Sequence, residues 1–106
     1  MAERESIYRN LKFLVIDDFS AMCKQVERIL SGAGARHIDI VYDGEKALLN
    51  CSREKYDVIF ADFNLGSGKN GQQLLEELRF RKWLKSTCAY IMITAEATKD
   101  FCLWCY

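Results

Sequence analysis

The sequence predicts an α/β domain built on one doubly wound parallel β-sheet with helices on both faces. The first observation is alternation, because apolar stretches of strand length are separated by amphipathic stretches of helix length. Alternation at this spacing is typical of β-α-β units joined by right-handed crossovers. The second observation is that the strand-like stretches are nearly unbroken apolar runs, as in strands buried on both faces. The 106 residues are enough for a single domain.

The first half of the chain predicts two strands and two helices after a polar lead-in over residues 1–10. Residues 11–16 form an apolar run broken by one lysine, which indicates a strand. Ser20 is a suitable cap for a helix, which the glycines of segment 31–34 would end. The apolar residues of that helix recur at helical spacing: Met22, Val26, Ile29, Leu30 and Ala33. Residues 37–42 predict the second strand. The short helix that follows has an apolar face of Ala47, Leu48 and Cys51.

The second half predicts two more strands and two more helices. Residues 56–61 form a third apolar run that ends abruptly at a carboxylate, and a polar, glycine-rich loop over residues 62–70 follows. Leucines at helical spacing predict a helix over residues 71–84. Residues 89–94 predict the fourth strand, and residues 95 to about 105 are expected to start a fourth helix.

Composition excludes several classes of function. Acidic and basic residues balance at 15 each, so no basic excess points to nucleic acid and no basic cluster points to a membrane surface. No apolar run approaches the roughly 18 residues that a membrane span needs. The charged first residues lack the apolar centre of a signal peptide, and the five cysteines show no disulfide pattern. We therefore predict a cytoplasmic protein with free thiols.

Four polar residues are expected to meet at one edge of the sheet. Asp17 and Asp18 follow the first strand, Asp62 follows the third apolar run, and Thr94 ends the fourth strand. In sheets of this type, sites form beyond the carboxyl ends of the strands. Clustered carboxylates repel one another unless a cation joins them, and oxygen ligands suit Mg²⁺. The sequence therefore predicts a Mg²⁺ site at the three acids, where Asp62 can take up a phosphoryl group and Thr94 can hydrogen-bond it.

Each of these residues also has a plainer structural role. Asp17 and Asp18 can form a turn and cap a helix, where negative charge gains from the helix dipole. Thr94 can cap a following helix in the same way. Their common position at one edge of the sheet is what favours the functional interpretation.

Three segments in order resemble the receiver domain of bacterial two-component response regulators of the chemotaxis type. They are residues 13–20 (FLVIDDFS), 57–64 (DVIFADFN) and 91–97 (IMITAEA), and the resemblance extends over about residues 11–100. It implies a flavodoxin-like sheet with strand order 2-1-3-4-5. It also implies that the domain begins at about residue 11 and continues to residue 106.

The resemblance implies a role for each site residue. Asp62 would accept a phosphoryl group from a sensor histidine kinase or a phosphotransfer protein. Asp18 would bind Mg²⁺ directly, Asp17 through a water molecule, and Asn64 through its backbone carbonyl. Thr94 would follow the phosphoryl group and switch the surface around the fourth strand and fourth helix.

Two departures from the family pattern matter. The loop after Asp62 lacks the usual proline. The family's fifth strand, the lysine at its end and the fifth helix cannot be placed, so the domain over residues 11–106 is expected to be incomplete, with order 2-1-3-4. The fourth strand would then have an open edge. We expect this edge and the uncharged tail 101–106 to pack against a second copy, giving a homo-oligomer.

Three functions remain open at this point. The first is a phosphoacceptor signalling domain that is not a conventional enzyme. The second is a receiver-like interaction or dimerisation domain that no longer signals by phosphorylation, because the C-terminal lysine is absent. The third is a magnesium-dependent phosphatase with Asp62 as nucleophile. That phosphatase chemistry needs a second acid two residues later, where Asn64 stands instead.

Overall fold

The computed structural model describes residues 7–66, 68–94 and 102–105, with the backbone alone for Thr94 and for residues 102–105. Within these ranges the chain forms one five-stranded sheet in the order β2-β1-β3-β4-β5 and three helices. The strands are β1 (Lys12–Ile16), β2 (His37–Val41), β3 (Val58–Asp62), β4 (Ala89–Thr94) and β5 (Cys102–Cys105). The helices are α1 (Ser20–Gly32), α2 (Gly44–Arg53) and α3 (Gly71–Phe80).

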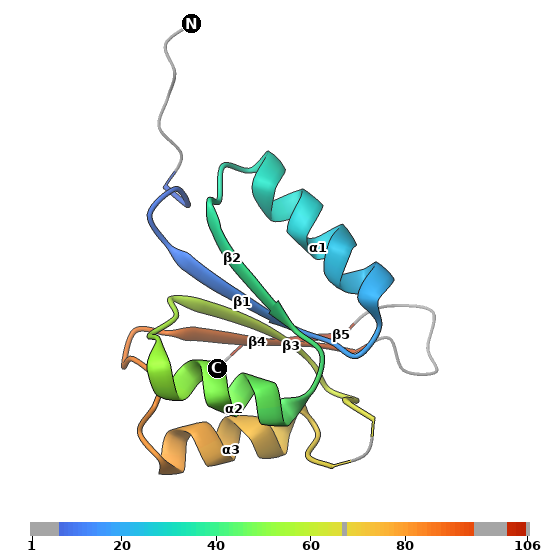
Figure 1. The fold of residues 1–106 in the computed structure, drawn as a ribbon, viewed down its shortest axis with the longest axis vertical. Coiled ribbons are helices and arrows are strands. Elements are labelled where there is room, and N and C mark those ends of the chain that lie inside the picture. Colours follow the sequence, from blue (N-terminus) through green and yellow to red (C-terminus); the bar gives the residue numbers. More distant parts are fainter. Residues whose placement is uncertain (1–6, 67, 95–101, 106) are drawn as a thin grey trace, which may run out of the picture.

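The predicted parallel arrangement of the first four strands is confirmed. β1 pairs in parallel with β2 on one side and with β3 on the other, and β4 extends the sheet beyond β3. Helix α1 lies over one face of the sheet, while α2 and α3 lie over the other (Figure 1). This is the flavodoxin-like, doubly wound order 2-1-3-4, and it places the carboxyl ends of β1, β3 and β4 at the same edge.

The main core lies between the sheet and the helices α2 and α3. Alternate strand residues point into it, because successive side chains of a strand face opposite sides of the sheet. These strand residues are Leu14, Ile16, Ile59, Ala61, Tyr90 and Met92. Helix α3 meets them with buried leucines at helical spacing: Leu74, Leu75 and Leu78. In the part of the chain described here, no helix is both long and apolar enough to cross a membrane.

The expectation that the chain has no fifth strand is wrong. Residues Cys102–Cys105 form β5, which pairs antiparallel with β4 in a register that sets Thr94 opposite Cys102 and Ile91 opposite Cys105. A parallel neighbour needs a crossover of about a dozen residues or more, whereas an antiparallel neighbour can follow a shorter connection. Only residues 95–101 separate β4 from β5, so the antiparallel direction is the one that the connection allows.

This strand corrects two further expectations. The edge of β4 is not open, because β5 occupies its backbone hydrogen-bonding groups. One of the two reasons for predicting a homo-oligomer is therefore removed. The helix expected over residues 95 to about 105 is wrong at its end, since 102–105 form a strand. The rest of that expected helix lies outside the described residues.

Helix α3 ends at Phe80, four residues before the predicted end at residue 84. The reason is a left-handed residue, Lys82, with φ 60°. The Lys82 amide donates to the Arg79 carbonyl at 3.0 Å, and the Trp83 amide donates to the Leu78 carbonyl at 3.0 Å. The second bond closes a reverse turn typical of helix ends, where glycine is the common left-handed residue.

At the opposite edge of the sheet, where the parallel strands begin, Asp57 connects neighbouring segments of the chain. One carboxylate oxygen accepts the backbone amide of Lys12 at 2.8 Å, and the other forms an ion pair with Lys85. The Asp57 amide and carbonyl bond to Lys12 and Ala89. The Lys85 ammonium, followed by the Lys12 amide, lowers the pKa of Asp57 below its ordinary 3.8. This aspartate thus ties together the segments that lead into β1, β3 and β4.

Asp57→Asn is expected to lower the free energy of unfolding by about 1 kcal/mol near neutral pH, because a partly exposed ion pair with Lys85 is lost. Since the folded pKa is depressed, the contribution of Asp57 is present above the ordinary value of 3.8 and is lost as pH falls through the folded pKa. Urea unfolding across this pH range measures the effect. A difference between wild type and variant that stays constant down to the lowest pH would contradict it.

Candidate functional site

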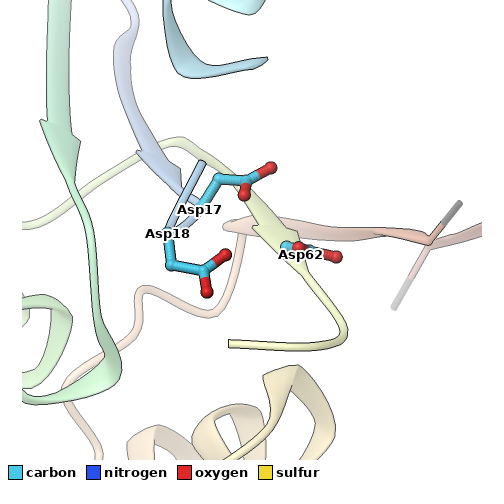
Figure 2. Close-up of side chains that lie close together, drawn as sticks. All are labelled: Asp17, Asp18 and Asp62. Carbon is cyan, nitrogen blue, oxygen red and sulfur yellow. The ribbon is translucent and has the colours of Figure 1, made fainter. Parts of the chain in front are cut away.

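The structure brings three of the predicted site residues together. Asp17 and Asp18 follow the end of β1, and Asp62 is the last residue of β3. Because β1 and β3 run in parallel, their acidic ends reach the same edge of the sheet. Figure 2 shows the three side chains extending from these two segments into one region. Carboxylate oxygens of all three lie within 4.8 Å of one another.

The environment of Asp17 and Asp62 opposes the ionisation of these two carboxyl groups. Burial, followed by the negative charge of Asp17, raises the pKa of Asp62 to about 6. Burial is also the main cause that raises the pKa of Asp17, and the charge of Asp18 adds to it. Asp18 itself is exposed. The cluster therefore holds more negative charge than its surroundings favour, and a divalent cation would relieve that cost.

Hydrogen bonds hold Asp17 and Asp62 in place. The Phe19 amide donates to Asp17 Oδ1 at 3.0 Å, and the Asn64 amide donates to Asp62 Oδ1 at 3.3 Å. The buried Cys23 thiol donates to the Asp17 carbonyl at 3.3 Å. Burial, with the charge of Asp17 second, raises the pKa of Cys23 to about 11, so this thiol stays neutral beside the acids. Sequence reasoning missed Cys23, whose only signal was its place in the first turns of α1.

The loop after β3 folds back toward Asp18 at Gly66. This glycine has φ 80°, and a Cβ atom there would lie 3.2 Å from Asp18 Oδ2. Its amide donates to Asn64 Oδ1 at 3.3 Å, which stabilises the turn. The predicted role of Asn64, a backbone carbonyl ligand, stays a prediction, while its amide and side chain order the loop beside the acids.

Gly71 and Tyr90 fix the start of α3 beneath this loop. The Gly71 amide donates to the Phe63 carbonyl at 2.7 Å, and the Tyr90 hydroxyl donates to the Gly71 carbonyl at 2.8 Å. A Cβ atom on Gly71 would lie 2.7 Å from the carbonyl oxygen of Asp62. Tyr90 is 1% exposed. A tyrosine in a buried strand needs a partner for its hydroxyl, so the sequence signals such a bond without naming Gly71.

Thr94 is the last residue of β4, at the same edge of the sheet as Asp62. In the register of β3 with β4, Asp62 lies opposite Ile93, the neighbour of Thr94. The backbone of Thr94 thus lies at the edge of the sheet where the sequence places this residue, next to the end of β3. The Thr94 side chain lies outside the described part of the structure, and the role of its hydroxyl stays a prediction.

The donor set of the cluster fits a hard divalent cation. All three side chains offer carboxylate oxygens, which Mg²⁺ and Ca²⁺ prefer over the nitrogen and sulfur ligands of zinc sites. Asp17 and Asp62 are half-buried and Asp18 is exposed, so water can reach the site and complete the coordination shell that Mg²⁺ usually keeps.

Comparisons with known proteins agree on one family. A sequence model described as the response regulator receiver domain matches residues 13–105. The Vibrio cholerae chemotaxis protein CheY-3 is 34% identical over 92 residues, which cover 87% of this chain and 69% of that protein. The Pseudomonas aeruginosa chemotaxis protein CheY is 32% identical over 90 residues, covering 85% of this chain and 71% of its own. The solved structure of CheY4 of Vibrio cholerae superposes with a TM-score of 0.73 at 25% identity, covering 83% and 71%.

Proposed function

The chain belongs to the response regulator receiver domain family, and on this premise we propose that it is a phosphoacceptor signalling domain of a two-component system. Asp62 takes a phosphoryl group from a sensor histidine kinase or a phosphotransfer protein. The observation that carries the proposal is the meeting of Asp17, Asp18 and Asp62 at one edge, with carboxylate oxygens within 4.8 Å of one another. Receiver domains are signalling domains rather than conventional enzymes.

The proposed chemistry at Asp62 is the transfer of a phosphoryl group from an imidazole nitrogen of the donor to a carboxylate oxygen. An oxygen of the ionised carboxylate attacks phosphorus, so that a new O–P bond forms while the P–N bond to the donor's imidazole breaks. The pKa of about 6 leaves Asp62 mostly ionised at neutral pH. The hydrogen bond from the Asn64 amide orients one oxygen of this carboxylate.

Asp18 would bind the cation directly and Asp17 through water, and Asp62 and the Asn64 carbonyl would complete the protein ligands. When bound, Mg²⁺ would neutralise charge on the phosphoryl oxygens. Gly66 supports this arrangement, because the loop approaches Asp18 closely there. Thr94 would hydrogen-bond the phosphoryl group and convey its presence to the surface around β4. The cytoplasmic location and the homo-oligomer stay predictions.

Incubation with acetyl phosphate and Mg²⁺, followed by intact mass measurement, tests the proposal. We expect a gain of one phosphoryl group that depends on Mg²⁺ and maps to Asp62. A chain that binds Mg²⁺ without forming the adduct would contradict it and favour the interaction domain. Continuous release of phosphate from unrelated phosphomonoesters would instead favour the phosphatase.

One observation favours the interaction domain as a second candidate. β5 is antiparallel and has the sequence Cys-Leu-Trp-Cys, so it differs in direction from the family's fifth strand and carries no lysine. The lysine of that strand pairs with the phosphoryl group in the family pattern, and charge-assisted bonds of this kind are strong. β5 itself therefore cannot supply this contact to phosphorylated Asp62.

A further inference from the structure

A hollow lies toward the amino-terminal edge of the sheet, opposite the edge where Asp17, Asp18 and Asp62 meet. It has a volume of about 420 Å³ and lies where the last turns of α3 meet the start of β4. Its apolar wall includes Leu75, Leu84 and Tyr90. Three cations line it as well: Arg79, Lys82 and Lys85. We call this hollow the basic pocket.

We propose that the basic pocket binds a small organic anion, a phosphate or carboxylate group carried on an apolar body. The volume is within the range of about 300–1,000 Å³ typical of ligand sites. No carboxylate is among the described residues that line the pocket, whereas the Ser86 hydroxyl is. Cations beside a hydroxyl form strong charge-assisted hydrogen bonds to anions, and the apolar wall would take the body of the ligand.

The three cations contribute differently. Lys85 is held by its ion pair with Asp57, so part of its charge is already compensated. Arg79 and Lys82 are exposed on the last turn of α3 and just after it. The half-buried Cys88 thiol adds no opposing charge, because burial raises its pKa to about 11. An incoming anion therefore meets the positive charge of the exposed Lys82 and no opposing charge from the Cys88 thiol.

The backbone at Lys82 points to a function for this cation. Its φ of 60° is left-handed, and it is the one residue other than glycine with positive φ among the described residues. At this place after a helix, glycine adopts the conformation without the steric cost that a side chain adds. Residues that oppose a local structural preference often lie at functional sites. Here the exception places a charge at the mouth of the basic pocket.

NMR titration of the ¹⁵N-labelled protein without Mg²⁺ tests the proposal. The probes are phenyl phosphate, benzoate and inorganic phosphate. We expect amide shifts at Lys82, Ser86 and Tyr90, and tighter binding of a probe that carries the phenyl ring than of inorganic phosphate. Whether phenyl phosphate or benzoate binds more tightly identifies the anionic group. Shifts that map elsewhere, or no binding of either aromatic probe, would overturn the proposal.

Lys82→Gly separates binding from folding. It should weaken the tighter-binding aromatic probe about threefold, because one exposed charge is lost, while the urea midpoint rises because the left-handed strain is relieved. Lys69→Gln removes a lysine from the loop before α3, away from the basic pocket, and should leave the affinity unchanged. Unchanged affinity in Lys82→Gly, or an equal loss in both variants, would count against a specific anion site.

Discussion

Asp62→Asn is expected to take up no phosphoryl group and yet to be more stable than wild type when Mg²⁺ is absent. The amide cannot act as the attacking carboxylate, so the mass gain with acetyl phosphate should disappear entirely. The same change removes a charge that burial and Asp17 disfavour. At about pH 8 we expect the free energy of unfolding to rise by about 1 kcal/mol, a value reduced for the solvent screening of a half-exposed group.

The pH dependence of this gain has a defined sign. The pKa of Asp62 is raised from 3.8 to about 6 in the folded state, so the ionised form costs stability. Wild type therefore loses stability as pH rises from the ordinary value through about 6, while the variant cannot ionise at this position. The difference should be absent below about pH 4 and complete above about pH 7 in urea unfolding.

Magnesium should reverse the order of stability. A cation that binds only the folded state raises the free energy of unfolding. Once the cation concentration exceeds the dissociation constant, this gain grows with the logarithm of the concentration. Wild type keeps all three carboxylates and should gain more than Asp62→Asn. Asp43→Asn is a matched control, because asparagine can still cap α2 through Lys46, and this variant should accept phosphate as wild type does. Phosphoryl uptake by Asp62→Asn would exclude Asp62 as the acceptor.

Gly71→Ala is expected to lower the free energy of unfolding by about 2 kcal/mol and to weaken Mg²⁺ binding. The added Cβ would lie 2.7 Å from the carbonyl oxygen of Asp62 and 3.1 Å from the Cα of Phe63. Both are backbone atoms, so the end of β3 or the start of α3 must shift. Overpacking of this kind costs up to about 3 kcal/mol, and the better helix propensity of alanine returns about 1 kcal/mol.

The chain offers a matched control for this substitution. Gly44 is the first residue of α2, as Gly71 is of α3, and each follows a capping side chain. A Cβ on Gly44 would have no atom within 4 Å. Gly44→Ala should therefore be neutral or slightly stabilising, and its Mg²⁺ affinity should match that of wild type. Urea unfolding and Mg²⁺ titration measure both variants. Equal losses of stability and Mg²⁺ affinity in the two would show that the effect comes from alanine at the start of a helix and not from the contact with Asp62.

Much of the fold could be predicted because it is encoded locally. Unbroken apolar runs are characteristic of buried parallel strands, and β1 to β4 formed where those runs stand. The leucines of α3 recur at helical spacing and are buried as expected. The meeting of Asp17, Asp18 and Asp62 also follows from the chain, because parallel strands deliver their last residues to one edge.

The sequence by itself therefore determined the alternating architecture and the edge at which the acids gather, since both depend on periodicity and on the parallel direction of neighbouring strands. Only the tertiary structure decided that β5 runs antiparallel to β4, that Cys23 bonds to Asp17, and that Tyr90 holds Gly71. These contacts depend on how closely separate segments approach in space. No local pattern along the chain specifies these distances, because they depend on how the folded segments pack.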